Sequence, residues 1–268
     1  MIDAYRNSCM TNDPNMAANS ALILSTQLKT TGDKGEGQKE LYGVAINALG
    51  HAHDVYEKAY GRWCGITSGA RFETIDFRVS GRMVIGLGTT SVLENGLTLH
   101  HTYGTPVIPG SALKGMTAHY CDNNLGISNP DFSQSNKILR EDGKKESKPG
   151  RYYQMLFGTN DNAGIISFHD AWITPAWVVN GKSLLPDVIT THHQKYYSDS
   201  PIQPTDTEDP IPIQFLSVQG VFRIVLEVED NSIDAIKWRQ FMMVMVKKAL
   251  ADLGIGGKTS SGYGRMKP

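Results

Sequence analysis

The pattern of apolar residues along the chain constrains the fold most strongly, because it contains several strand-like segments. Residues 71–87 alternate apolar and polar side chains, which is typical of a strand that buries one face. Residues 164–174 and 213–229 are further β segments, and Gly220 is expected as a bulge or turn in the second of them. The Asn95-Gly96 dipeptide predicts a hairpin. The chain is therefore expected to contain a sheet.

Three helical patterns flank these strands. Residues 37–63 repeat apolar side chains at spacings of three and four. A tight turn at Pro109-Gly110 precedes a helix that we expect to begin after the N-cap Ser111. Residues 233–253 form a long helix whose apolar centre must be buried. Strands paired across two crossover helices predict an α+β fold with a ferredoxin-like βαββαβ core and insertions.

The polar segments divide the chain into a lead-in, one domain and two insertions. Residues 1–36 predict a loosely ordered lead-in, and residues 37–268 predict a single domain. Insertions or loops are expected at about residues 123–150 and 175–212, where Asn, Ser, Lys and Gly, or prolines and acidic residues, gather. A chain of 268 residues is long enough for a core that needs no disulfide or metal staples.

Composition excludes several classes of protein. An apolar fraction of 40% and a charged fraction of 20% exclude a chain that is disordered throughout. Three cysteines without a CxxC pair exclude a disulfide scaffold or a zinc ribbon as the main organiser. The polar N-terminus is not that of a signal peptide, and no run of about 18 apolar residues predicts a membrane span. We therefore expect a cytoplasmic protein.

Charge is distributed unevenly near the C-terminal end. The whole chain carries a formal net charge of −1, which excludes a uniformly basic nucleic-acid binder. Residues 199–234 carry a net charge of −7, whereas residues 237–268 carry +6. Such asymmetry indicates an anionic partner at the basic end. The alternative is an acidic solvated loop that precedes a basic solvated helix face.

The glycine-rich segment GIGGKTSSGYGR, residues 254–265, is the strongest candidate site. It is not a Walker A loop, because Asp252 stands where the first glycine of that motif is required. It is not a Rossmann dinucleotide-binding motif either, because Thr259 stands where the third glycine is required. What remains is a backbone that can approach a phosphate closely, with cationic and hydroxyl side chains beside it. The alternative is a loop that only caps the preceding helix. The candidate residues are Gly256, Gly257, Lys258, Thr259, Ser260 and Arg265.

A second candidate anion site is the start of the helix at Ser111. Free N–H groups and the positive end of the helix dipole gather there. Lys114 lies near this end, where the dipole disfavours a cation, so we interpret it as serving a ligand rather than as a surface lysine on an ordinary capped helix. Histidines with neighbouring aromatic residues are suited to stacking on bases and contacting phosphates. The further candidates are His101, Tyr103, His192 and His193.

Neither a metal site nor a catalytic set is predicted. His51 and His53 are two residues apart, which on a helix places their side chains roughly 200° apart around the axis. One ion does not readily bind both. The sequence contains no GxSxG nucleophile elbow and no Ser-His-Asp order. We therefore predict no metal, no cofactor and no catalytic residues.

Three segments taken together resemble the RAMP superfamily of CRISPR-associated proteins. They are IPGSALKG at residues 108–115, LFGTNDNAGIISFHDA at 156–171 and GIGGKTSSGYGRM at 254–266. The resemblance covers most of residues 70–268 and departs mildly from the family pattern, for example at Ala112, where serine is usual.

Further segments narrow the resemblance. Residues 93–110, 186–198 and 210–218 look like the sixth-subunit family of type III-B Cmr effector complexes, with Thr191 where a proline is common. The resemblance implies an RRM-like core and a place in a ribonucleoprotein that uses guide RNA to bind foreign RNA in antiviral defence. Guide RNA, target RNA and the backbone RAMP subunits are the implied partners.

The resemblance also implies a non-catalytic subunit that lies toward the 3′ end of the guide. The alternative is a metal-independent endoribonuclease that processes the guide. In that case His101 or His192 would be the general base that takes a proton from a ribose 2′-OH. A third interpretation is a scaffold that contacts only protein.

Overall fold

The computed structural model describes residues 19–27, 36–88, 95–139, 145–191, 211–230 and 232–268. Its core is a six-stranded sheet in the order β10-β1-β9-β6-β2, with β5 paired to β9 beside this path. All of these pairings are antiparallel, so the protein is of the predicted α+β class. The strands are β1 (Phe72–Val79), β2 (Val107–Ile108), β5 (Ser167–Phe168), β6 (Ala171–Ile173), β9 (Val221–Glu227) and β10 (Met266–Lys267).

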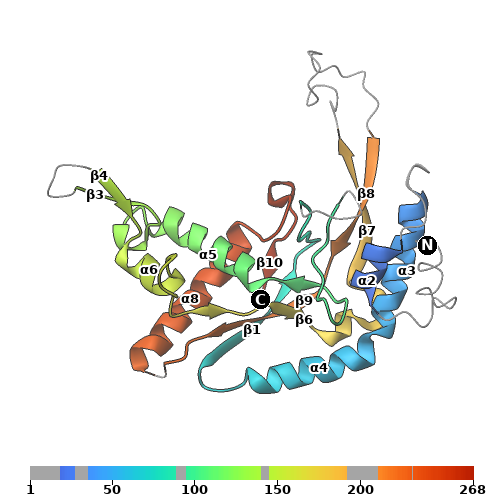
Figure 1. Ribbon diagram of the computed structural model, residues 1–268, viewed down its shortest axis with the longest axis horizontal. Coiled ribbons are helices and arrows are strands. Elements are labelled where there is room, and N and C mark those ends of the chain that lie inside the picture. Colours follow the sequence, from blue (N-terminus) through green and yellow to red (C-terminus); the bar gives the residue numbers. More distant parts are fainter. Residues whose placement is uncertain (1–18, 28–35, 89–94, 140–144, 192–210, 231) are drawn as a thin grey trace, which may run out of the picture.

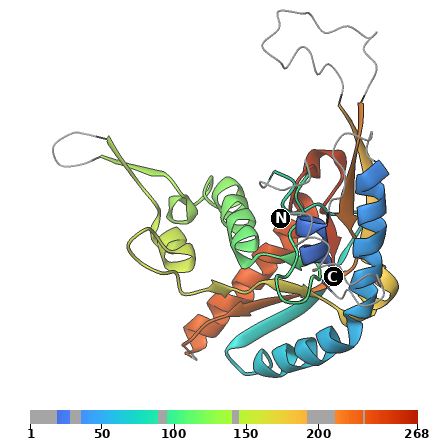
Figure 2. The same cartoon turned by 45° about the vertical axis from the view of Figure 1, so that its right-hand side comes forward.

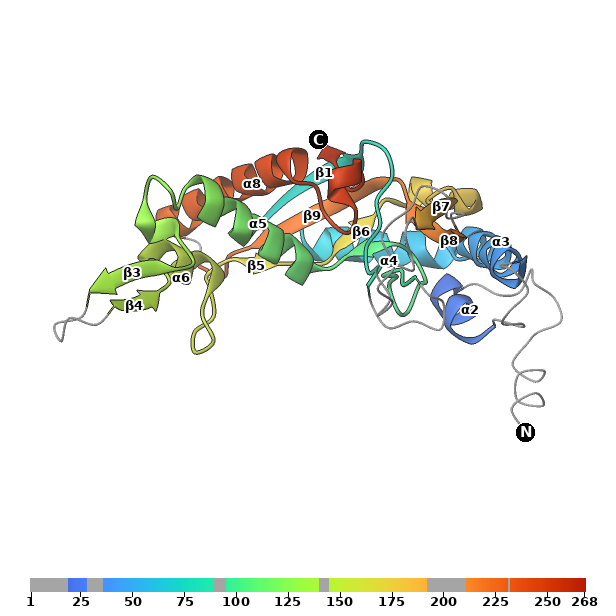
Figure 3. The ribbon, with the colours of Figure 1, turned by 90° about the horizontal axis from the view of Figure 1, so that it is seen from above.

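Two helices, α5 (Gly110–Asn124) and α8 (Ile233–Asp252), lie side by side on one face of the sheet (Figure 3). The central residues Met242 and Val246 of α8 are fully buried in the same core as Phe222 and Ile224 of β9. Each such side chain contributes about 1.5–3 kcal/mol when it leaves water. The predicted long helix with a buried apolar centre is thus confirmed. None of the helices in the described ranges is long and apolar enough to cross a membrane.

The single helix expected over residues 37–63 is instead two helices, α3 (Glu36–His51) and α4 (His53–Ile66). Figure 1 shows them meeting at a sharp angle, because they pack on different surfaces. α3 shares a small core with Leu216, whereas the Tyr56 hydroxyl of α4 donates to the carbonyl oxygen of Ile173 at 2.6 Å. The spacing of apolar residues by three and four continues from α3 into α4, so the sequence pattern could not show that the helix breaks between them.

The described part of the lead-in is ordered, contrary to expectation. Residues Ser20–Thr26 form helix α2, whose N-cap Asn19 accepts a hydrogen bond from the N–H of Leu22. Ile23 and Leu24 are buried against α3. The short apolar patch in this polar segment is therefore enough to attach a helix to the domain.

Both expected insertions contain strands in their described parts, at residues 136–139, 145–148 and 184–191, whereas most of the acidic, proline-rich part of the second insertion lies outside the described residues. Figures 1 and 2 show two hairpins that project from the body in different directions. The pairing runs over four residue pairs in one hairpin and eight in the other. The hairpins are β3 (Asn136–Leu139) with β4 (Lys145–Lys148), and β7 (Leu184–Thr191) with β8 (Ile211–Val218). Three short 3-10 helices accompany them: η1 (Pro130–Phe132), η2 (Pro175–Trp177) and η3 (Val179–Gly181).

Strand β1 ends at Val79, short of the predicted residue 87. The chain beyond it pairs irregularly, through the Thr98 N–H to the Ile85 carbonyl at 2.8 Å and through a bridge between Met83 and Val218. The prediction of a hairpin that turns at Asn95-Gly96 is therefore wrong, because the Gly96 N–H donates to the Leu87 carbonyl at 3.4 Å and so pairs with an earlier segment. Gly220, with φ of 150°, connects β8 to β9, as expected of a turn.

Candidate nucleic-acid interface

The glycine-rich segment folds back onto residues 82–87 after helix α8. Two backbone hydrogen bonds attach it there, from the Gly257 N–H to the Val84 carbonyl at 2.7 Å and from the Gly264 N–H to the Arg82 carbonyl at 2.8 Å. A third, from the Ile255 N–H to the Gly264 carbonyl at 2.9 Å, joins the two ends of the segment. The side chain of Ile255 is buried, at 3% exposed. The segment is thus a fixed loop whose base belongs to the core.

The glycines of this loop serve the fold in different ways. Gly256 has φ of +92°, and a Cβ there would collide with the Val84 carbonyl oxygen. Gly257 has no positive φ, and a Cβ there would meet Leu87 at an ordinary 3.5 Å. At neither position is a close approach of a phosphate needed to explain whether a side chain fits. Gly256 excludes one because of Val84, and the Gly257 N–H is already bound.

Two arginines of the basic C-terminal end form hydrogen bonds with backbone carbonyls of the protein itself. Arg239 is 6% exposed, and its Nη1 donates to the Ala70 carbonyl at 2.7 Å. Arg265 Nη1 donates to the Ala251 carbonyl at 2.8 Å and also to the Asp252 carbonyl. These carbonyls end helix α8, where no helical N–H remains to bind them. Arg265, predicted as an RNA contact, is therefore placed as a helix cap.

The outer end of the loop carries Lys258, Thr259 and Ser260. Residues Thr259–Ser261 form the short 3-10 helix η4, and Ser260 is exposed. Among the residues that the structure describes, no carboxylate forms an ion pair with Lys258. Within the described ranges, the side chains of these three candidates make no hydrogen bond or ion pair, unlike that of Arg265.

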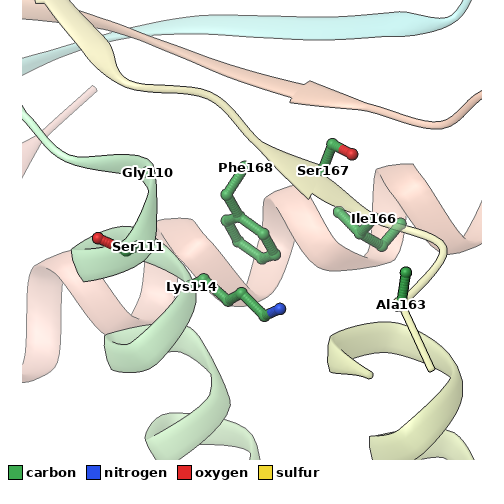
Figure 4. Close-up of a pocket in the computed structure, with 8 residues that line it drawn as sticks. Gly110, Ser111, Lys114, Ala163, Ile166, Ser167 and Phe168 are labelled. Carbon is green, nitrogen blue, oxygen red and sulfur yellow. The ribbon is translucent and has the colours of Figure 1, made fainter. Parts of the chain in front are cut away.

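The second candidate site is a pocket of about 290 Å³ at the start of α5. Figure 4 shows Lys114 beside the ring of Phe168, with its ammonium group pointing toward the side of the pocket that carries Ala163. A cation, an aromatic ring and hydroxyl groups in one cavity suit a phosphate and a base. The lining residues are Gly110, Ser111, Lys114, Ala163, Gly164, Ile166, Ser167 and Phe168.

The start of α5 differs from the prediction in one respect. Pro109, not Ser111, is the N-cap, and Ser111 is the second residue of the helix. The carboxylate of Asp170 accepts the Gly110 N–H at 2.7 Å, so one of the free N–H groups is already bound to an anion of the protein. Gly110 is required because a Cβ would collide with Phe168. Sequence reasoning missed Asp170, although it lies in the FHDA stretch.

The two candidate sites have separate surroundings. The glycine-rich loop contacts Val84 and Leu87, whereas Ser111 and Lys114 line the pocket with residues 163–168. The structure does not bring them into one cavity in the part of the chain that it describes.

The aromatic candidate Tyr103 lies within a cluster of rings. Its centroid is 4.8 Å from His100, 5.7 Å from Tyr56 and 5.8 Å from Trp172. Burial lowers the pKa of His100 below its ordinary value, and the negative charge of Asp170 only partly offsets this effect. Much of Tyr103 is therefore engaged by the protein itself.

The remaining histidine candidates differ in what the structure shows. His101 is exposed, and its backbone carbonyl accepts a bond from Asn19. His192 and His193 lie outside the described residues. A histidine that the sequence did not single out, His169, contacts Glu227 at 2.7 Å. No group of three potential metal ligands is found in the described ranges.

The comparison with protein families identifies the class of the chain. The family model of the RAMP superfamily matches residues 76–267, which extend from within β1 to β10 and include both candidate sites. The chain belongs to the RAMP superfamily.

Individual relatives are more specific. The chain is 29% identical over 254 residues to the CRISPR system Cmr subunit Cmr6 of Pyrococcus furiosus, an alignment that covers 80% of this chain and 73% of that one. It is 22% identical over 203 residues to the Cmr6 subunit of Saccharolobus solfataricus, over 74% and 59% of the two chains.

A solved structure supports the fold. A chain of the type III-B Cmr-beta complex bound to cognate target RNA, studied by cryo-electron microscopy, superposes with a TM-score of 0.61 at 18% identity. The match covers 97% of this chain and 81% of that chain.

Proposed function

We propose that this chain is a non-catalytic RNA-binding subunit of a type III-B CRISPR effector complex. In this role it contacts the guide RNA and its target toward the 3′ end of the guide, with other RAMP subunits as neighbours, in the cytoplasm and in antiviral defence. The observation that carries the proposal is the outer end of the glycine-rich loop, where Lys258 has no carboxylate partner among the described residues. Membership of the RAMP superfamily and the two Cmr6 relatives support it.

The core of this subunit is ferredoxin-like in our proposal. Along the chain, β1, α5, β6, β9, α8 and β10 follow one another in the βαββαβ order. In space the four strands lie in the order β10-β1-β9-β6, so the fourth and third strands flank the first. The short β2 and β5 are additions to this core.

The proposal is tested in a reconstituted complex that carries the guide. Lys114→Ala combined with Lys258→Ala should weaken retention of guide or target RNA and reduce the slope of log affinity against log salt by about 1.4, or 0.7 for each lost contact. Lys237→Ala is the matched control, because this exposed lysine pairs with Asp234 at the other end of α8. Unchanged affinity and salt slope in the double variant would overturn the proposal.

The ribonuclease alternative has its own test. Among the described residues no carboxylate is bonded to the ring of His101, and His169 is the histidine that contacts a glutamate. We therefore expect no discrete cleavage when the isolated chain is incubated with labelled guide precursor in the absence of metal. Cleavage that His101→Ala or His192→Ala abolishes would show that the chain is an enzyme.

A further inference from the structure

The six-stranded sheet has a second face, on the side away from α5 and α8. Side chains alternate along β1, so that Phe77 and Val79 are buried in the core whereas Asp76 and Arg78 are exposed on the opposite face. In the views of Figures 1 and 2, α5 lies above the sheet and α4 below it. Because Asp76 and Arg78 remain exposed, α4 leaves part of this second face open to solvent.

Two cations on this open face are direct neighbours. Arg78 of β1 and Lys267 of β10 are paired in the register of the antiparallel strands, so their side chains point to the same face. Both are exposed, and among the described residues neither forms an ion pair with a carboxylate. Like charges that are directly opposite each other in a sheet destabilise it. An anion bound at this pair would remove the repulsion.

The positive charge continues across the sheet to β9. Arg223 is paired in register with Asp76, but its Nη1 lies 3.6 Å from a carboxylate that is 48% exposed, which makes a weak ion pair. The other carboxylate on this face of β9, Glu227, is already bound by Arg71 at 3.0 Å and by His169 at 2.7 Å. The open face therefore carries more positive than negative charge.

Aromatic rings border these cations. Trp172 of β6 is paired in register with Arg223, and Trp63 of α4 stacks on Trp172 with ring centroids 5.1 Å apart and 6° between the planes. The guanidinium group of Arg78 lies over the ring of Trp177, 5.5 Å from its centroid. Trp63 and Trp177 are partly exposed. Cations alone would suit an acidic protein segment equally well, whereas rings beside cations favour a strand that carries both bases and phosphates.

We propose that this open sheet face binds a segment of single-stranded RNA, with phosphates on the paired cations and a base against the tryptophan stack. The inference rests on the proposed function and deepens it, since it assigns to RNA a surface that neither candidate site includes. The pocket residues Ser111 and Lys114 belong to α5, which covers the other face of the sheet. The open sheet face is formed by Trp63, Asp76, Arg78, Trp172, Arg223 and Lys267.

The phosphate contacts are tested with the full-length chain and a fluorescent oligouridylate. Arg78→Gln combined with Lys267→Gln should weaken binding about tenfold and reduce the slope of log affinity against log salt by about 1.4, or 0.7 for each lost contact. The melting temperature of this double variant should stay unchanged or rise, because the repulsion between the two cations is gone. Lys237→Gln is the matched control, because this exposed lysine lies on α8, at the other face of the sheet.

Two further variants separate an RNA surface from a merely structural one. Asp76→Asn removes the exposed carboxylate of the face and should strengthen RNA binding about twofold to threefold, because an anion beside the phosphates repels them. A structural role of Asp76 alone would leave the affinity unchanged. Trp63→Leu should weaken binding by about fivefold or more with little change in salt slope, because stacking releases no counterions.

The outcomes distinguish this inference from the proposed function. No binding of the oligouridylate by the wild-type chain, or normal binding by the Arg78–Lys267 double variant, overturns the inference. If that variant binds RNA normally but fails to join the reconstituted complex, the open sheet face contacts a neighbouring protein subunit instead. The proposed function stands in these cases as long as Lys114→Ala with Lys258→Ala weakens RNA retention in the complex. If only the variants of the open sheet face weaken it, the assignment of RNA to the loop and the pocket fails.

Discussion

At the scale of single residues, neighbouring glycines of the same loop have different tasks. Gly256 combines a positive φ with close approach to the Val84 carbonyl, whereas Gly257 has room for a methyl group and an ordinary φ. Glycine density alone therefore does not show which positions need glycine. Only the contacts of the folded loop separate them.

We predict that Gly256→Ala lowers the free energy of unfolding by about 1–3 kcal/mol, because the methyl group meets backbone that cannot move freely. Gly257→Ala should change it by less than about 0.5 kcal/mol, because the new contact with Leu87 is an ordinary one. Chemical denaturation of the two variants measures the difference. Equal losses would contradict the assignment of the strained position to Gly256.

At the scale of elements, the first helix of the core depends on a carboxylate from a distant strand. Asp170, directly before β6, binds the N–H of Gly110 at 2.7 Å and so joins the strand to the start of α5. Proline at the N-cap has no side chain that can do this.

Asp170→Ala should therefore cost about 1 kcal/mol in the free energy of unfolding, within the 0.5–2 kcal/mol usual for loss of a cap. Asp170→Asn retains an acceptor oxygen and should lose less. Thermal or urea unfolding of both variants tests this. A loss for Asn as large as that for Ala would show that the charge, not the hydrogen bond, matters.

A second link between elements joins the glycine-rich loop to the β7–β8 hairpin. Asp187 of β7 accepts the hydroxyl of Tyr263 at 2.9 Å and pairs with Arg82 at 3.0 Å. Burial by itself would raise the pKa of Asp187, but the bonds from Tyr263, Val188 N–H and Arg82 outweigh it and lower this pKa below its ordinary 3.8. Asp187 thus stabilises the folded chain in its ionised form.

The lowered pKa of Asp187 makes the stability of the folded chain depend on pH. Since the pKa of Asp187 is lower in the folded chain, the unfolded chain takes up the proton first as the pH falls. Ionised Asp187 contributes on the order of 1 kcal/mol to the free energy of unfolding, as expected for a partly exposed pair. This contribution is fully present above the ordinary pKa of 3.8 and is lost as the pH falls through the lower pKa of the folded chain. The stability difference between wild type and Asp187→Asn should therefore shrink between pH 7 and pH 3. A difference that is constant with pH would contradict this account.

At the scale of the whole molecule, the sequence predicts the fold class and the two core helices, α5 from the turn at Pro109-Gly110 that precedes it and α8 from its long apolar centre. It does not predict the break at Ala52 or the strands β7 and β8 as a hairpin outside the main sheet. These depend on which surface each segment meets, as in the bond between Tyr56 and Ile173. Local pattern carries no information about such partners.

The candidate site was predictable to a similar extent. Lys114 and Lys258 were singled out from the turn and helix-end residues around them. The roles of Arg265 and Asp170 did not, because each acts through a backbone group that is 13 or 60 residues away in sequence. Of the residues that sequence reasoning assigned to a ligand, Arg265 therefore caps helix α8, whereas Lys114 and Lys258 are the ones on which the proposed function depends.

The central claim is that the outer end of the glycine-rich loop contacts RNA. A density map of the assembled complex with guide and target, resolved around residues 258–260, tests it most directly. The account predicts a phosphate of the RNA within about 4 Å of the Lys258 ammonium group, the reach of an ion pair, with Gly256 and Gly257 packed on Val84 and Leu87. Density there for a neighbouring protein subunit, or for solvent, with RNA passing elsewhere, would contradict it.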